Sequence, residues 1–133
     1  MRIFLLVYGL LFSSMTLYFI QQKTLQQSLE DGEAIYQDFC VQCHMSEGQG
    51  VPNAFPPLAK SDFLKTNLEQ SLKGVKYGMR GPIKVNGKNY DGVMVAQGLD
   101  DEEVADVMNY VLSNWGNKLE AQITTAQIAE LSK

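Results

Sequence analysis

Residues that bind metal ions through nitrogen or sulfur are scarce in this sequence, which has one histidine, His44, and two cysteines, Cys40 and Cys43. A structural zinc site needs about four ligands, most often cysteine or histidine. Three such residues cannot complete a Cys/His zinc site, so that class of site is excluded. Positive charge is also limited, because 11 lysines and arginines against 15 aspartates and glutamates leave a net charge of −4. This balance argues against nucleic-acid binding.

Long alternating strands and internal repeats are also missing from the 133 residues. The apolar residues instead recur with helical spacing in several segments, and the length suits one domain. We therefore expect an all-α fold, a small helical domain.

Only one long hydrophobic run is present, the uncharged segment 3–20 behind Arg2. Eighteen helical residues span about 27 Å, close to the ~30 Å hydrocarbon core of a bilayer. A secretory signal usually has a shorter apolar stretch and a small-residue cleavage site, which we do not find after Ile20. We expect residues 1–22 to be an uncleaved membrane anchor, with a cleaved signal peptide or a buried helix as alternatives. The first two place the domain on the periplasmic side of the cytoplasmic membrane, or free in the periplasm.

The remaining chain divides into short helices and loops. The polar segment 23–28 is expected to be a tether or a fraying helix start, followed by a domain over residues 29–117 and a C-terminal tail, 118–133. Within the domain, apolar spacing predicts helices at 29–43 and 62–73. Glycine and proline predict loops at 47–57 and 77–92, the second with a tight turn at Asn86-Gly87.

Capping signals mark the last helices. Asp100 with Glu103 three residues later forms a capping box, and an apolar stripe runs from there until Gly116. Thr124 with Gln127 repeats the pattern and predicts one more short helix in the tail.

The two cysteines and the histidine form one unit, Cys40-Val41-Gln42-Cys43-His44. This is the attachment motif of c-type haem. Thiols three positions apart on a helical turn can each add to one porphyrin vinyl group, and the next residue then presents its imidazole to the iron. A thioredoxin-like dithiol would require a βαβ context, which the pattern lacks. A structural disulfide remains an alternative in an exported domain, although a loop of two residues constrains little.

The chain resembles the class I cytochromes c over residues 29–117. Gly32, Tyr36 and Cys40 repeat the family's spacing on its first helix, and Val107 and Tyr110 sit where the family places the partners of a close helix crossing. The resemblance implies the cytochrome c fold, wrapped around one covalent haem c and its iron. The segment Phe55-Pro56-Pro57-Leu58-Ala59 resembles the one that lines the histidine side of the haem. It implies that the Pro56 carbonyl accepts a hydrogen bond from His44, with Pro57 as the alternative.

Methionine is the natural second iron ligand, because the single histidine is already used. Met1 and Met15 lie in the hydrophobic leader, Met45 follows His44, and Met108 falls on a buried stripe. Met79 and Met94 remain, both in glycine-rich segments, and an open or lysine-ligated iron is a further alternative. The resemblance favours Met94, because Tyr90-x-Gly92-x-Met94 before the capped helix is similar to the family's ligand segment.

His/Met ligation fills both axial positions and raises the reduction potential, which favours electron transfer. We therefore expect an electron-transfer protein, not an enzyme, that passes single electrons between respiratory redox partners. The alternatives are a haem-based small-molecule sensor and an electron-entry subunit of a larger oxidoreductase. No second histidine is available as a distal acid or base.

Basic residues gather in the middle of the chain. Between positions 60 and 88 there are only two acidic residues, Asp62 and Glu69, and seven basic ones: Lys60, Lys65, Lys73, Lys76, Arg80, Lys84 and Lys88. Complementary charge raises the rate of encounter between proteins. We expect a basic rim at the haem edge that recognises an acidic patch on redox partner proteins. Arg80 is also expected to pair with the haem propionates.

Overall fold

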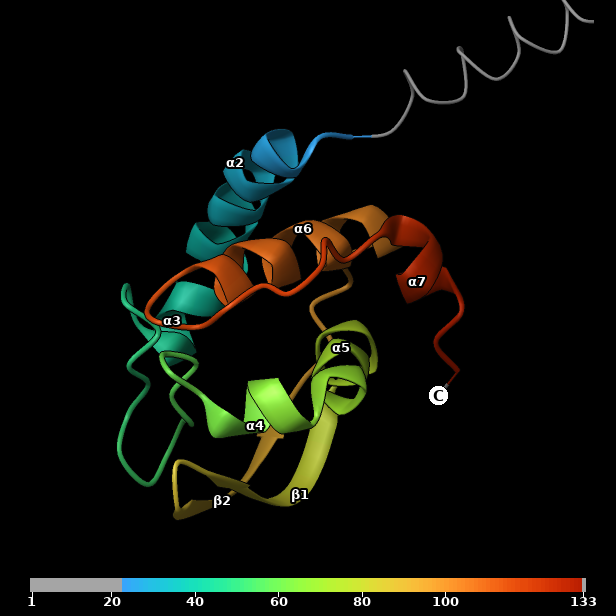
Figure 1. The fold of residues 1–133 in the computed structure, drawn as a ribbon. Helices are drawn as coiled ribbons and strands as arrows, with labels where there is room; N and C mark the ends of the chain where they lie inside the picture. Colours follow the sequence, from blue (N-terminus) through green and yellow to red (C-terminus); the bar gives the residue numbers. More distant parts are fainter. Residues whose placement is uncertain (1–22, 133) are drawn as a thin grey trace, which may run out of the picture.

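The computed structural model describes residues 23–132, which fold as helices packed around a central helix with one β-hairpin below them (Figure 1). The hydrophobic helix predicted at residues 3–20 lies outside this range. Within 23–132, no helix is both long enough and apolar enough to cross a membrane. The helices are α2 (Leu25–Ile35), the π-helical turn η1 (Tyr36–Cys40), α3 (Val41–His44), α4 (Asp62–Thr66), α5 (Leu68–Tyr77), α6 (Asp101–Ser113) and α7 (Thr125–Ala129).

The first helix begins earlier than the sequence predicts. Thr24 caps α2 by accepting a hydrogen bond from the Gln27 backbone, while the Gln27 side chain bonds back to the Thr24 N–H. This reciprocal cap satisfies backbone donors that a helix start otherwise leaves unpaired. Residues 23–28 were predicted to be a tether or a helix start, and the structure shows the helix start. Ser28 within it is buried.

α2 crosses α6 at the close contact expected from the sequence. A β-carbon added to Gly32 would overlap the Asp106 carbonyl and lie 2.9 Å from Cβ of Tyr110. The lack of a side chain at Gly32 thus lets the two backbones touch. Beside the crossing, the Tyr36 ring lies 5.7 Å from that of Tyr110 and 4.8 Å from that of Trp115, centroid to centroid.

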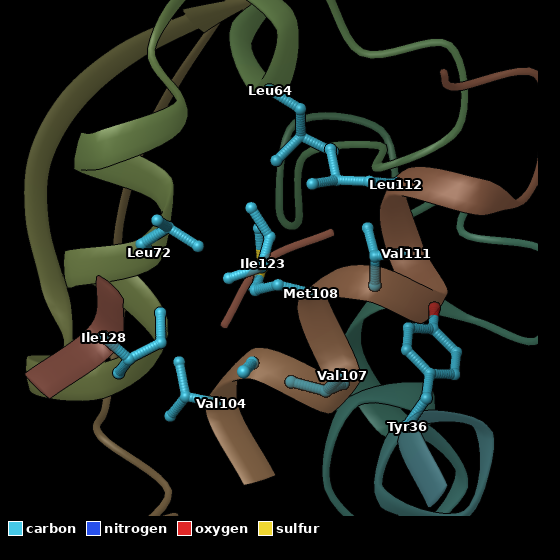
Figure 2. Close-up of a cluster of buried hydrophobic side chains, with 11 residues drawn as sticks. Tyr36, Leu64, Leu72, Val104, Val107, Met108, Val111, Leu112, Ile123 and Ile128 are labelled. Carbon is cyan, nitrogen blue, oxygen red and sulfur yellow. The ribbon is translucent and has the colours of Figure 1, made fainter. Parts of the chain in front are cut away.

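The core is built on α6. Asp100 caps this helix with Glu103 in the predicted capping box. The buried face of α6 meets side chains from η1, α4, α5 and the C-terminal segment (Figure 2). Ile123 and Ile128 belong to this core, with 4% and 0% of their surface exposed. The packed unit therefore extends beyond the predicted boundary at residue 117, and α7 begins at the predicted Thr124 cap.

Residues 77–92, predicted as a loop, are mostly a β-hairpin. Strand β1 (Met79–Val85) pairs antiparallel with β2 (Lys88–Met94), from Met79 opposite Met94 to Val85 opposite Lys88. The predicted turn at Asn86-Gly87 is present, with φ of 50° and 78°. The strands escaped prediction because Gly81 and Gly92 interrupt the alternation of apolar and polar residues by which a strand is recognised.

The helix predicted at 62–73 is divided in two. Asn67 adopts φ −130° and ψ 47°, outside the helical region, and so ends α4 and begins α5. α5 then continues to Tyr77, where Gly78 at φ 84° turns the chain into β1. This turn places the hairpin directly below α5.

Candidate haem site

Two adjoining hollows, of about 680 and 880 Å³ including their open mouths, lie between η1, α3, the 54–58 loop, α5 and the hairpin. Most of the side chains that line them are apolar, as is usual for sites that bind large ligands. Six residues line both hollows, so the two form one cavity: Cys40, His44, Pro56, Met79, Ile83 and Met94.

The cysteines of the attachment motif stand at the wall of this cavity. Cys40 ends η1 and Cys43 lies in α3 one turn later, and both thiols are free rather than joined in a disulfide. Burial, with a smaller contribution from Cys43, raises the pKa of Cys40 to about 11. The Cys40 side chain is therefore a neutral thiol at physiological pH, the species whose S–H adds across a vinyl group.

His44 is held in one orientation. Its Nδ1 lies 3.0 Å from the carbonyl oxygen of Pro56. A carbonyl only accepts, so Nδ1 carries the hydrogen and the lone pair of Nε2 is left for a metal. Burial lowers the pKa of His44, partly offset by the bond to Pro56, and so favours the neutral imidazole that binds metals. The predicted bond is confirmed, with Pro56 rather than Pro57 as its acceptor.

Both candidate methionines reach the cavity. Met79 and Met94 are partners in the hairpin, and each lines both hollows. Met108 borders the first hollow but is 2% exposed within the α6 core, as predicted for a packing residue. The sequence offered no sign that Met79 and Met94 would stand side by side, because the hairpin itself was not predicted.

Arg80 is not brought to the cavity. In β1, Met79 and Ile83 project toward the hollows and Gly81 borders one of them, whereas Arg80 alternates to the other face, is exposed and borders neither hollow. Sequence reasoning also missed two lining residues, Ile83 and Tyr90, which are register partners. The sequence carried no clear signal for them, because the glycines of this segment interrupt the alternation of apolar and polar residues.

The donor set fits a haem and not a bare metal ion. One imidazole with a free Nε2, two thioethers and two thiols border a largely apolar cavity. Among the described residues, no three or more histidine, cysteine, aspartate or glutamate side chains gather into a metal-binding group. Such a cavity suits a large apolar cofactor that brings its own equatorial ligands to the metal.

Comparison with known proteins agrees with this geometry. The sequence profile of the family described as "Cytochrome c" matches residues 29–115. Cytochrome c-552 of Thermus thermophilus is 43% identical over 93 residues, which are 65% of this chain and 70% or 62% of the two Thermus proteins of that name. The cytochrome c subunit of alcohol dehydrogenase (quinone) from Gluconobacter oxydans is 32% identical over 104 residues, 75% of this chain but only 21% of that subunit. Cytochrome c-554(548) of Halomonas halodenitrificans is 36% identical over 74 residues, 56% of this chain and 82% of that protein.

The profile match covers most of the described fold and includes the crossing at Gly32, the attachment motif and both candidate methionines. A member of this family carries electrons and is not an enzyme. With its Cys-x-x-Cys pair beside a haem-sized cavity, the chain belongs to the cytochrome c family, and Cys40 and Cys43 attach its haem c covalently.

Proposed function

We propose that this protein carries single electrons between respiratory partners with its haem iron held axially by His44 and Met94. One observation carries the proposal: His44, with its Nδ1–H committed to Pro56, borders the same cavity as the thioether of Met94. These residues come from α3 and β2, which both border the cavity.

The chain's own residues prepare the site for electron transfer. The iron, when bound, supplies the change between ferric and ferrous states, and a thioether ligand raises its reduction potential. The Pro56 carbonyl fixes the imidazole ring, which keeps Nε2 aimed at one point. The apolar walls contributed by α5 and α6 exclude water, and the thioether links of Cys40 and Cys43 retain the cofactor in both redox states.

The axial assignment is tested by the weak absorption band that marks a ferric iron–sulfur bond near the red end of the visible spectrum. We expect the band to be lost in Met94→Ala and kept in Met79→Ala. The reverse pattern would transfer the ligand role to Met79. Carbon monoxide added to the reduced wild-type protein should shift its spectrum only slowly, because Met94 occupies the axial position. A rapid shift would favour the alternative of a haem-based sensor.

The electron-entry subunit remains a second candidate because of the match to the cytochrome c subunit of alcohol dehydrogenase (quinone). The chain matches only about a fifth of that subunit, whereas it matches most of the Thermus cytochrome c-552. We favour the separate carrier on this ground. A haem-stained band that migrates in a large complex with a dehydrogenase, after mild solubilisation, would decide for the subunit.

We further propose that residues 3–20 anchor the domain on the periplasmic side of the cytoplasmic membrane. The support is the length of the uncharged run and the lack of a cleavage site behind it. The haem-stained protein band should then be found in the membrane fraction, and washing with high salt should not release it. Release of the haem-stained band with the soluble periplasmic fraction would instead indicate a cleaved leader.

The partner surface is proposed to be the exposed basic part of the hairpin. Of the seven basic residues between positions 60 and 88, Lys73 and Lys76 form ion pairs with Glu69 and Asp101. Arg80 and Lys84 are exposed on the face of β1 turned away from the cavity, and Lys88 is exposed at the turn end of β2, opposite Val85. We define these three residues as the basic hairpin face, which would receive an acidic patch on a redox partner.

A further inference from the structure

Two methionines stand at the open end of the hairpin. Met79 is the first residue of β1 and Met94 the last residue of β2, and the register pairs them directly. Residues paired in this way project to the same face of the sheet, with Cβ atoms about 4.5–5.5 Å apart. Each therefore offers a thioether sulfur to the same cavity, and the pairing alone does not decide which sulfur is available to the iron.

The surroundings of Met79 distinguish it from Met94. A β-carbon added to Gly74 in α5 would lie 2.7 Å from Cε of Met79, 3.6 Å from its Cβ and 4.0 Å from its Sδ. The Met79 side chain thus lies along Gly74, with its terminal methyl in the space where a side chain would be. We call this space the Gly74 notch. Glycine inside a helix is less stable than alanine, so its presence at position 74 needs a structural reason. We assign that reason to the space it leaves for the Met79 methyl.

The notch has fixed surroundings. Beyond Gly74, Lys76 donates a 2.8 Å hydrogen bond to the Ile128 carbonyl and Tyr77 a 2.6 Å bond to the Leu131 carbonyl. These bonds tie the end of α5 to the C-terminal segment. Gly78 follows, and a β-carbon there would lie 2.8 Å from the Met94 carbonyl. The residue that ends α5 therefore lies close to the end of the strand that carries Met94.

We propose that the Gly74 notch selects the axial ligand: it holds the Met79 thioether against α5 and leaves Met94 as the methionine that binds the iron. This inference rests on the proposed function, in which Met94 is the ligand. Gly74 is accordingly a positioning residue that acts through Met79. The substitution Gly74→Ala would fill the notch and push the Met79 methyl into the cavity, where its sulfur competes with that of Met94.

The test uses the reduced holoprotein with methionine labelled at its methyl carbon. A methionine methyl bound to haem iron lies over the porphyrin ring and is shifted strongly upfield in the NMR spectrum. We expect one shifted methyl in the wild type and a second one in Gly74→Ala. The double variant Gly74→Ala/Met79→Leu should lose the second resonance and return to one. Gln70→Ala, on the exposed side of α5, is the matched control and should resemble the wild type.

A further arm leaves Gly74 in place. In Met94→Leu the notch should retain Met79, so no shifted methyl should appear and carbon monoxide should bind fast. The double variant Gly74→Ala/Met94→Leu should regain a shifted methyl, now from Met79, and bind carbon monoxide more slowly.

The outcomes separate this inference from the proposed function. A shifted methyl in Met94→Leu at a chemical shift that differs from the wild-type one, or a single unchanged Met94 resonance in folded Gly74→Ala, would overturn the selection by Gly74 while the Met94 assignment stands. Loss of the shifted methyl in Met79→Leu, with wild-type Gly74, would overturn the Met94 assignment itself and the inference with it.

Discussion

Gly32 is the residue on which the crossing of α2 and α6 depends. Even the smallest side chain there would overlap the Asp106 carbonyl, which is backbone and cannot turn aside. We expect Gly32→Ala to destabilise the domain by about 1–3 kcal/mol, the usual range for overpacking. Thermal unfolding of the holoprotein measures this. Glu33→Ala, on the exposed side of the same helix, is the matched control and its stability should change little.

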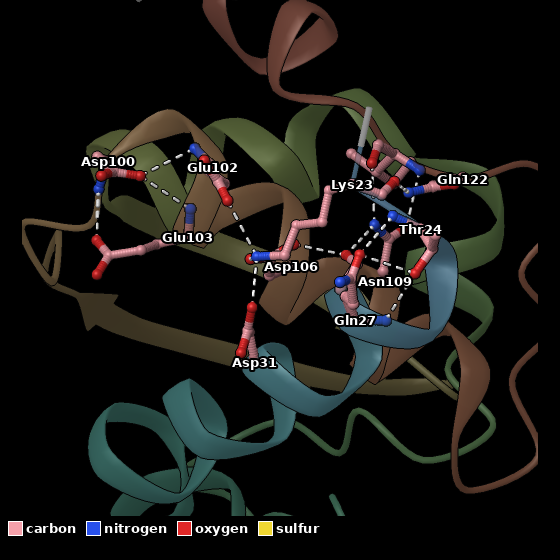
Figure 3. Close-up of polar contacts among 12 residues, drawn as sticks. Lys23, Thr24, Gln27, Asp31, Asp100, Glu102, Glu103, Asp106, Asn109 and Gln122 are labelled. Atoms are coloured by element: carbon pink, nitrogen blue, oxygen red, sulfur yellow. Dashed lines mark hydrogen bonds and ion pairs between the residues drawn. The ribbon is translucent and has the colours of Figure 1, made fainter. Parts of the chain in front are cut away.

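Asn109 is the buried polar residue that joins three parts of the chain. It is fully buried, accepts a 2.7 Å hydrogen bond from the Ile123 N–H, and donates bonds of 2.9 Å to the Ile123 carbonyl and to the Ser28 hydroxyl (Figure 3). Its side chain therefore links α6 to α2 and to the C-terminal segment. This role could not be predicted from the sequence, because asparagine on a helix is usually exposed.

Replacement of Asn109 by leucine should leave the buried N–H and carbonyl of Ile123 without partners. Each unpaired buried group costs about 1–3 kcal/mol, so the loss of stability should be at least about 2 kcal/mol. Denaturant unfolding gives this value. The exposed Asn89 in β2 offers the control, and a similar midpoint for Asn109→Leu and Asn89→Leu would contradict the structural role.

Elements defined by local chemistry could be predicted from the sequence, and those defined by tertiary contact could not. The starts of α6 and α7 follow from side-chain caps within three residues, and both were predicted correctly. The β-hairpin was missed except for its Asn86-Gly87 turn, because its inner face is formed only where it meets the cavity. Likewise the attachment motif identified Cys40, Cys43 and His44, whereas the side-by-side placement of two methionines required the strand register.

The C-terminal segment behaves as part of the core although it follows the predicted domain. Ile128 is completely buried and packs with the apolar faces of α5 and α6 (Figure 2). Truncation of a buried isoleucine to alanine costs about 2–5 kcal/mol. We therefore expect Ile128→Ala to lower the denaturation midpoint clearly. Gln127→Ala, one residue earlier and exposed, should not, and equal midpoints would show that the segment is only loosely attached.

At the scale of the whole molecule, polar contacts join the two ends of the described chain to α6. Lys23 forms ion pairs with Asp31, Glu102 and the buried Asp106, and its carbonyl accepts a hydrogen bond from Gln122 (Figure 3). The buried carboxylate is thereby paired, which avoids the large cost of an isolated buried charge. Lys23, which follows the segment proposed as an anchor, is therefore fixed to the domain and is not part of a free tether.

Charge is divided between regions of the molecule. The acidic first turn of α6 holds Asp101, Glu102 and Glu103, while the basic hairpin face presents Arg80, Lys84 and Lys88 beside the cavity. A protein with a net charge of −4 therefore presents three basic residues on a hairpin that borders the cavity. Such asymmetry orients an acidic partner during encounter, because opposite charges attract over the distance at which the two proteins first interact.

Electron exchange with the natural partner should therefore slow as salt rises, because exposed charges are screened beyond ~8–10 Å at physiological ionic strength. Stopped-flow rates across an ionic-strength series measure this dependence. The charge reversals Lys84→Glu and Lys88→Glu should lower the rate at low salt and flatten the series. Lys118→Glu changes net charge equally but lies outside the hairpin, in the C-terminal segment, so its series should stay close to that of the wild type. Equal effects at Lys84 and Lys118 would mean that net charge governs the encounter, and a rate independent of salt would mean that the basic hairpin face does not steer docking.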